Sequence, residues 1–337
     1  MKSKYKTALL VLKTLNNKGF FSGEDLSKKF KVSRSTIFNA VSLLKSWGID
    51  IYAVSGKGYQ LATSLEWFNE EEIRKFLSPD VQNWIETFSL HPFIDSTNTY
   101  LMKAPPPVDR KKMHLCISET QFLGRGRSNN HWLTPFGRSI ACSLMITSFY
   151  SPKNLTTLPL VIALAVVQAL KKLSLPTIQI KWPNDLWFQG AKLGGILIET
   201  KPSEHPQGGT LVVIGIGLNE KLTNQEKISF PYPVTDLQTV IDSHQPNFKF
   251  SKNYLLALLL EELYQALSLF ETNGFQPFLE KWDYYDALKG KIIYAHAAHA
   301  GILIGKAHGI TQNGLLKVIS NNVEHWVHHS DVSIKVD

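Results

Sequence analysis

Cysteine and long apolar runs are both scarce in this chain. Its 337 residues include two cysteines, Cys116 and Cys142, and these lack the CxxC spacing of zinc and redox sites. Both lie in apolar segments, so we expect reduced core residues and not disulfide partners. No run of eighteen apolar residues occurs, and the basic start leads into an amphipathic segment, not an apolar signal core. We therefore expect a cytoplasmic protein that makes no membrane contact.

A metal-ligand pattern is lacking as well. The C-terminal stretch is rich in histidine, but the spacing fits no ligand set on a helix or a strand, and no cysteine lies nearby. We interpret these residues as surface histidines and predict no metal site. They are His296, His299, His308, His325, His328 and His329.

Acidic residues are scarce at the N-terminus. The whole chain has 36 Lys and Arg against 28 Asp and Glu, a formal net charge of +8. Residues 1–63 hold eleven of the basic residues and three of the acidic ones, so this segment carries the entire excess. A small basic unit attached to a neutral one is typical of nucleic-acid binding, although a solvated lysine-rich surface would give the same count.

Residues 1–63 also have the periodicity of a winged helix-turn-helix. An amphipathic helix is predicted within residues 4–15, a second follows the cap Ser22, and a third begins after the cap Ser33. In such a motif the last of these helices enters the major groove. A hairpin with Lys57 at its turn would be the wing that touches phosphate. A winged helix used only for protein contacts is the alternative. The predicted DNA contacts are Ser33, Arg34, Ser35, Thr36, Asn39 and Lys57.

The most informative stretch is Lys181–Glu199, which reads KWPNDLWFQGAKLGGILIE. Pro183 interrupts a predicted strand and forces an extended turn, and Gly194 and Gly195 let a ligand approach the next strand. We predict a β-hairpin with polar groups at one end, suited to a small acidic ligand or a phosphate. A surface hairpin with a solvated tip is the alternative. The polar groups are Lys181, Asn184, Asp185 and Lys192.

Three other motifs have glycine or hydroxyl groups at the ends of predicted strands. In Gly124–Arg127, which reads GRGR, the glycines permit unusual dihedrals and the arginines donate to phosphate or carboxylate. GRGR alone is weak evidence, since such loops also bind RNA or stay flexible. The Ser-Thr-Asn sequence of residues 96–98 predicts a helix cap. GIGLN at residues 215–219 ends a buried strand and again allows close backbone approach.

Together these motifs resemble the biotin protein ligase family. The resemblance covers about residues 90–337, and its specific parts are GRGR followed by Trp132, and KWPNDL followed by KLGGIL, in that order. With residues 1–63 added, the chain is similar to the bifunctional bacterial form, which also represses transcription of biotin genes. One departure is the Ser-Asn-Asn-His sequence of residues 128–131, where a more basic tract is expected. Those positions help to build the dimer surface in the family, so the departure bears on ligand-induced dimerisation.

The resemblance implies an α+β, multidomain architecture. An N-terminal winged helix-turn-helix domain (residues 1–63) precedes a biotin ligase catalytic domain with a class II synthetase-like mixed sheet and helices (64–286). A small SH3-like β-barrel domain (287–337) follows, in agreement with short strand-like runs separated by Gly and Asn turns. Within the second domain, residues 65–90 are predicted to be helical, with Asn69 as the cap.

The resemblance further implies a reaction in two steps. The biotin carboxylate attacks the α-phosphate of MgATP to give biotinyl-5′-adenylate and pyrophosphate. A lysine of a biotin carboxyl carrier protein, part of acetyl-CoA carboxylase, then displaces AMP. Both steps build charge on oxygen atoms, so fixed positive donors matter more than a nucleophilic side chain. The implied substrates and cofactors are biotin, ATP and Mg²⁺, and the implied repressor is a homodimer that binds operator DNA when it holds biotinyl-5′-AMP.

Residue roles follow from the matching positions. The implied catalytic residues are Lys192, Arg125, Arg127, Asp185 and Lys181. The implied biotin-binding residues are Ser96, Thr97, Asn98, Gln121, Arg125, Gly126, Arg127, Lys192, Gly194 and Gly195. The implied nucleotide-binding residues are Trp132, Asn184, Lys192, Gly217 and Asn219, with packing in the core as the alternative for the tryptophan.

Two other functions are consistent with the same motifs. A lipoate ligase shares the catalytic architecture and differs in its acyl substrate, but the pairing of KWPNDL with GRGR argues against it. A transcription factor that senses a ligand without ligase activity is the second. Retention of the charged residues and of Gln121 argues against that reading.

Overall fold

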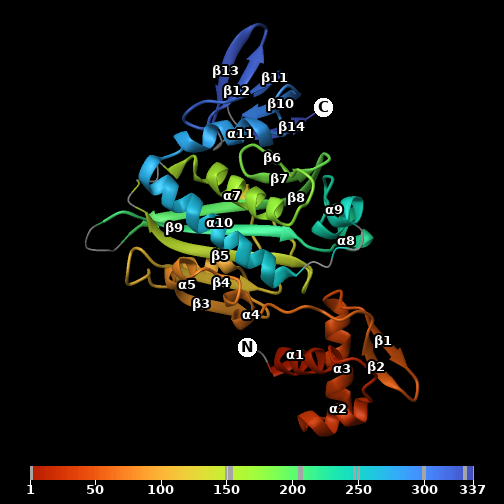
Figure 1. Cartoon of the computed structure of the whole chain (residues 1–337). Helices are drawn as coiled ribbons and strands as arrows, with labels where there is room; N and C mark the ends of the chain where they lie inside the picture. The colour runs from red at the N-terminus through yellow and green to blue at the C-terminus, as the bar shows by residue number, and fades with distance from the viewer. Residues whose placement is uncertain are drawn as a thin grey trace.

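A computed structural model describes residues 3–148, 150, 155–203, 208–245, 248, 251–297, 301–328 and 332–336. Its described strands form sheets of two, seven and five strands. Figure 1 shows the small N-terminal unit at one end, the large sheet with its helices in the middle, and the C-terminal sheet at the other end. Within those ranges, no helix is both long and apolar enough to cross a membrane. The domain boundaries after residues 63 and 286 stay predictions.

The N-terminal unit has the predicted winged helix-turn-helix elements. The side chains of Ser22 and Ser33 accept hydrogen bonds from backbone N–H groups of the following turns, so both predicted caps are confirmed. Between the two capped helices Lys31 has a left-handed backbone, which makes the tight turn. The elements are α1 (Ser3–Leu15), α2 (Gly23–Phe30), α3 (Arg34–Ser46), β1 (Ile51–Val54) and β2 (Gly58–Leu61).

The central unit is built on a mixed seven-stranded sheet. All neighbouring strands are antiparallel except β3 and β4, which are parallel. In spatial order the strands are β3 (Ile85–His91), β4 (Met113–Ser118), β5 (Ser139–Ser148), β9 (Thr210–Asn219), β8 (Ala191–Pro202), β7 (Asp185–Phe188) and β6 (Gln179–Lys181).

Helices pack against both faces of this sheet, and the two long ones lie on one face in Figure 1. Leu115 and Ile117 of β4 belong to the main apolar core with helices α7 (Leu158–Lys172) and α10 (Lys252–Asn273). Cys116, which points to the opposite face, packs in a smaller cluster with Leu101 of helix α6. Other helices of this unit are α6 (Thr97–Lys103), α8 (Asn224–Ile228), α9 (Leu237–His244) and α11 (Leu279–Tyr285), with 3₁₀ turns at Arg127–Asn129 and Gln276–Phe278.

The helix predicted over residues 65–90 is wrong in its extent. Asn69 does cap a helix, but this helix, α4, spans only Glu70–Arg74. A second helix, α5 (Pro79–Trp84), starts after the cap Ser78, and the chain then enters β3. Pro79 disfavours helical dihedrals at the residue before it, which separates the two helices. The strand was missed because β3 has only one fully buried residue and is paired on one side, with β4.

The single hairpin predicted for Lys181–Glu199 is in fact two successive hairpins. β6 pairs with β7, and Lys181 lies opposite Asp185 across the first turn. β7 then pairs with β8 across a second turn at Gln189 and Gly190, both with positive φ. The second hairpin brings Gly195 and Ile196 of β8 back beside the first turn.

The C-terminal unit is a five-stranded antiparallel sheet. Its strand order is β13-β12-β11-β10-β14, and no ladder joins β13 to β14 in the described ranges. The expected closed SH3-like barrel is therefore not confirmed. His299 and His329 lie outside the described residues. The strands are β10 (Ile292–Ala297), β11 (Gly301–Ile310), β12 (Leu316–Ser320), β13 (Val323–Val327) and β14 (Val332–Val336).

Candidate active site

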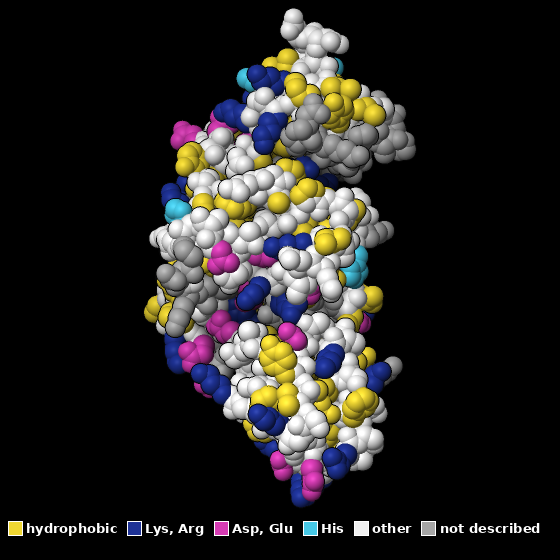
Figure 2. Space-filling model, turned by 90° about the vertical axis from the view of Figure 1, so that its right-hand side faces the viewer, with side chains coloured by type: hydrophobic (Ala, Val, Ile, Leu, Met, Phe, Trp, Pro, Cys, Tyr) yellow, Lys and Arg dark blue, Asp and Glu magenta, His cyan; other side chains and the backbone are white. Residues whose placement is uncertain are grey.

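A cavity of about 580 Å³ opens over one face of β8 and β9. In Figure 2, Lys and Arg side chains gather with a few acidic ones in a hollow at the middle of the molecule. Gly194 and Asn219 lie outside the lining. The sequence-predicted residues that line the cavity are Ser96, Thr97, Asn98, Gln121, Arg125, Gly126, Arg127, Trp132, Lys181, Asn184, Asp185, Lys192, Gly195 and Gly217.

One end of the cavity is a network of neutral polar groups at the start of α6. Gln121 Oε1 accepts hydrogen bonds from the Thr97 backbone N–H at 2.8 Å and from its hydroxyl at 3.1 Å. The Ser143 hydroxyl on β5 lies 2.6 Å from Asn98 Oδ1. Asn98 and Thr97 are each 3% exposed, so their donors and acceptors are held in fixed positions. Such an arrangement suits a small ring that carries both N–H and C=O groups.

Two glycines of β9 make room for the side chains above the sheet. A Cβ at position 215 would lie 2.3 Å from Asn98 Oδ1, and a Cβ at position 217 would lie 2.6 Å from the Trp132 ring. Asn98 and Trp132 therefore rest directly on the β9 backbone, two residues apart on the same face. The indole N–H of Trp132 is buried and has no hydrogen-bond partner among the described residues.

The GRGR loop folds back on itself at the cavity. The Gly126 N–H donates to Asn130 O at 2.7 Å, and the Trp132 N–H donates to Gly124 O at 2.8 Å. Arg125 leaves the loop and pairs with Glu199 at 2.6 Å. Arg127 donates to Asn184 Oδ1 at 3.2 Å, which ties the loop to the turn of KWPNDL.

The other end of the cavity is charged. Lys192 Nζ lies 2.8 Å from Asp185 Oδ1, and it also lies 5.7 Å and 5.6 Å from the ring centroids of Trp132 and Tyr232. Burial lowers the pKa of Lys181, and the neighbouring Asp185 partly offsets that effect. Burial likewise lowers the pKa of Arg127. Three cations around one carboxylate leave this end with excess positive charge, which suits an anion.

Comparison with known proteins agrees with this geometry. Residues 90–219 match the biotin/lipoate A/B protein ligase family, and residues 7–60 match a helix-turn-helix domain. The bifunctional ligase/repressor BirA of Escherichia coli K12 is 32% identical over 310 residues, 91% of each chain. This chain belongs to the BirA family of bifunctional ligase/repressors. The Bacillus subtilis member is 27% identical over 99% of this chain and 100% of its own length.

A solved structure agrees at the level of the fold. The biotin protein ligase from Aquifex aeolicus, solved in complex with biotin and ATP, has a TM-score of 0.60 to this structure at 22% identity. The likeness covers 75% of this chain and 99% of that one. The expected combination of a winged helix-turn-helix with a biotin-ligase α+β fold is thus confirmed.

Sequence reasoning missed several residues of the site. Glu199 holds both Arg125 and, at 2.9 Å, the Asn98 amide, and Ser143 bridges Thr97 and Asn98. Tyr232 enters from a loop far along the chain. No local motif marks Ser143 or Tyr232. Glu199 is the last residue of the Lys181–Glu199 stretch and lies within β8, where it faces the same side as Lys201 and Leu197.

The predicted DNA contacts lie at the start of α3, along that helix and at the turn of the wing. Arg34, Ser35 and Asn39 are exposed on α3, while Ser33 and Thr36 are joined by a 2.8 Å hydrogen bond at the start of the helix. Lys57 is exposed at the turn of the wing, 5.9 Å from the Phe20 ring. Phe38, which sequence reasoning missed, is 61% exposed on the same face of α3.

Proposed function

We propose that this BirA-family chain attaches biotin to a biotin carboxyl carrier protein and represses transcription. The observation that carries the enzymatic part is one cavity with two different ends. Donors and acceptors are fixed at the Asn98 end, where the Glu199 carboxylate is paired with Arg125, and the Lys192 end is cationic. Biotin combines a ureido ring with a carboxylate, so one molecule matches both ends. The β9 backbone beneath gives a continuous floor between them.

In the first step the biotin carboxylate oxygen forms a bond to the α-phosphorus of MgATP, and pyrophosphate leaves. The Gln121, Thr97 and Asn98 network would hold the ureido ring. Lys192 would contact the carboxylate and the α-phosphate, where negative charge builds up. Arg127 would neutralise phosphate charge. Mg²⁺ enters with the substrate ATP, whose phosphates supply ligands of the kind it prefers, and Asp185 is the nearest carboxylate to that end.

In the second step the amine of an acceptor lysine attacks the acyl carbon of biotinyl-5′-adenylate. The C–N bond forms as the bond from carbon to the phosphate oxygen breaks, AMP leaves, and the amine loses a proton. Lys192 would stabilise the acyl oxygen, and Asp185 would orient the incoming neutral amine, whose proton passes to solvent water. The folded GRGR loop would cover the mixed anhydride and limit its hydrolysis. Trp132, with its unsatisfied indole N–H, would stack near the adenine.

The repressor part rests on α3 and the wing. Arg34, Ser35 and Asn39 would reach base edges in the major groove, and Lys57 would contact a phosphate. We propose that the operator is palindromic and is bound by a homodimer that forms when biotinyl-5′-AMP orders the GRGR loop. A cytoplasmic location fits both roles and stays a prediction.

Biotin-dependent release of pyrophosphate from MgATP tests the enzymatic proposal, with lipoate as the parallel acid. Release with biotin alone is the expected result. Release with lipoate alone would move the chain to the lipoate ligases. Folded protein that releases pyrophosphate with neither acid would leave only the ligand-sensing repressor.

A further inference from the structure

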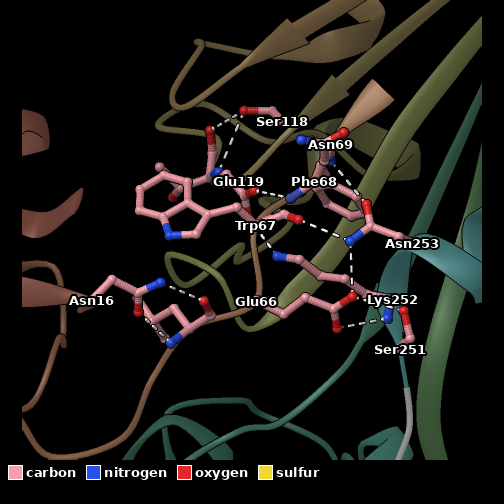
Figure 3. Close-up of polar contacts among 12 residues, drawn as sticks. Asn16, Glu66, Trp67, Phe68, Asn69, Ser118, Glu119, Ser251, Lys252 and Asn253 are labelled. Carbon is pink, nitrogen blue, oxygen red and sulfur yellow. Dashed lines mark hydrogen bonds and ion pairs between the residues drawn. The ribbon is translucent and has the colours of Figure 1, made fainter. Parts of the chain in front are cut away.

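The linker between the N-terminal unit and the central unit, residues 62–69, is fixed by hydrogen bonds and is not a loose tether (Figure 3). Near the start of the linker, the side chain of Asn16, which follows α1, hydrogen-bonds both the N–H and the C=O of Leu65. The Leu65 N–H donates to Asn16 Oδ1 at 2.7 Å, and Asn16 Nδ2 donates to Leu65 O at 2.9 Å. The N-terminal unit therefore ends in a segment whose position it controls.

The following residues are bonded to the start of α10. Glu66 accepts hydrogen bonds from the Ser251 hydroxyl, the Lys252 backbone N–H and the Asn253 amide, at 2.7, 3.0 and 2.8 Å. Asn253 also donates to Trp67 O and accepts from the Asn69 N–H, both at 2.9 Å. The Glu66 carboxylate thus caps the N-terminus of α10 from outside the helix. In turn, the Asn253 side chain of α10 hydrogen-bonds the linker backbone at Trp67 and Asn69.

The centre of this contact is a buried ion pair. Lys252 Nζ lies 2.6 Å from Glu119 Oε2, and the two side chains are 0% and 1% exposed. Both groups also touch Phe68 of the linker. Its backbone N–H donates to Glu119 Oε1 at 2.7 Å, and its ring centroid lies 4.3 Å from Lys252 Nζ. A buried ion pair is stable only when both charged groups also have other favourable contacts. Here Phe68 of the linker supplies a hydrogen bond to the carboxylate and a ring contact to the ammonium group.

Glu119 lies outside the cavity lining but is joined to it through Gln121, which lines the cavity. It follows β4 directly and is two residues before Gln121, whose Oε1 holds the start of α6. The intervening backbone has little freedom, because Thr120 Oγ1 donates to Thr134 O and the Gly137 N–H donates to Glu119 O. The bonds of the Glu119 side chain to Lys252 and Phe68 anchor this stretch together with those backbone bonds, so their loss loosens the segment that aims Gln121.

We propose that Glu119 and Lys252 are positioning residues that place Gln121 for biotin and fix the linker at the same time. The four residues Glu119, Lys252, Phe68 and Glu66 form what we name the linker clasp. Through it the seating of the linker and the geometry of the biotin end of the cavity depend on each other. This inference rests on the proposed function, since it assigns biotin to the Gln121 end.

The test compares the full-length protein with Lys252→Met, which keeps the buried stem and removes the charge. Lys172→Met is the matched control. Lys172, the last residue of α7, pairs with Glu262 of α10, also at 2.6 Å, but its side chain is half exposed. Each protein is assayed for the KM of biotin and of ATP in pyrophosphate exchange. Without substrates, chymotrypsin cleavage after Trp67 and Phe68 reports on the linker.

Lys252→Met is expected to raise the KM of biotin about fivefold or more, the lower end of the range for coupled sites, with the KM of ATP changed less than about twofold. Linker cleavage should be about tenfold faster than in the Lys172→Met control. Equal increases in both KM values would mean general loosening and would overturn the proposal. So would a linker that is cut no faster than in the control.

Glu66→Ala keeps the proposal testable if Lys252→Met does not fold. Glu66 is exposed, so its removal loosens the linker without a charge left in the core. Faster linker cleavage together with a raised KM of biotin is expected. Faster cleavage with an unchanged KM would show that linker and pocket are uncoupled. The proposed function fails separately, if the wild-type protein shows no biotin-dependent pyrophosphate exchange. The cleavage assay contains no substrate, so its result does not depend on that function.

Discussion

Lys192 is the residue whose loss tests the reaction most directly. Its ammonium group is the cation that lies between the two rings at the charged end of the cavity. Lys192→Ala should lower the rate of biotinyl-adenylate formation by about a hundredfold or more, as for other fixed transition-state donors. The fold should remain, because Asp185 is partly exposed and can be hydrated. Single-turnover pyrophosphate release measures the rate.

Lys201→Ala is the control for this prediction. Lys201 lies on the same strand, β8, and donates to Met102 O at 2.9 Å outside the active-site cavity. Its loss should leave the rate within about twofold of wild type, the scale of a typical surface change. A Lys192→Ala protein as fast as the control would remove Lys192 from the mechanism.

Gly217 tests the placement of the nucleotide. An alanine Cβ there would lie 2.6–2.8 Å from three atoms of the Trp132 ring, so the ring must move. Gly217→Ala should raise the KM of ATP about tenfold and leave the KM of biotin nearly unchanged, since loss of one stacked contact is worth about 1–3 kcal/mol. Trp132→Phe, which keeps a ring, should have a smaller effect. An increase confined to biotin would place Trp132 at the other ligand.

Residues within a motif could be predicted from the sequence, and residues between motifs could not. Lys192 and Asp185 stand in one continuous stretch whose turns bring them together. Ser143 and Tyr232 join the site only after the sheet has formed, one from the interior strand β5 and the other from a distant loop. Their roles depend on long-range packing, which no spacing rule encodes.

At the scale of the element, the wing gives a prediction for DNA binding. Lys57 is exposed at the turn between β1 and β2, where it would neutralise one phosphate. Lys57→Ala should weaken binding to all sequences alike and reduce the slope of log affinity against log salt by about one. Fluorescence anisotropy with DNA at several salt concentrations measures the slope. Lys75 is an exposed lysine that directly follows α4. Lys75→Ala should leave the slope unchanged, and an equal loss in both variants would refute a local contact.

The starts of helices could be predicted where a capping side chain determines them. Ser22, Ser33 and Asn69 each accept the backbone hydrogen bond that starts a helix, as predicted. β3 escaped prediction because it is an edge strand whose identity depends on pairing with β4, not on its own pattern. The C-terminal strands were predicted from turns, but turns alone do not fix whether a sheet closes into a barrel.

At the scale of the whole molecule, charged groups are concentrated in three places: the N-terminal unit, the active-site cavity and the junction near Lys252. The basic N-terminal unit is separated from the cationic cavity, and the buried carboxylates of Glu119 and Glu220 lie near the junction with Lys252. Burial raises the pKa of Glu220 to about 7, and Lys252 only partly offsets this. Its Oε2 has no hydrogen-bond partner in the described part of the chain.

This raised pKa predicts how folding stability depends on pH. Between about pH 4.5 and 7 the folded chain keeps the Glu220 proton that the unfolded chain has lost, so stability falls as pH rises through this window. Glu220→Gln removes the ionisation and should be more stable than wild type by about 3 kcal/mol above pH 7. The difference should shrink toward pH 4.5. Urea unfolding of both proteins at pH 5, 6, 7 and 8 measures it.

The comparison of the two proteins isolates Glu220, because every other titrating group is common to both. Glu280→Gln, on the outer surface of α11, is the control and should show no pH-dependent difference from wild type. A Glu220→Gln effect that is constant from pH 5 to 8 would mean that the carboxyl does not titrate in this window. A carboxyl that ionises near pH 7 beside Lys252 would instead make the junction between the DNA-binding and catalytic units less stable in alkaline conditions than in acid.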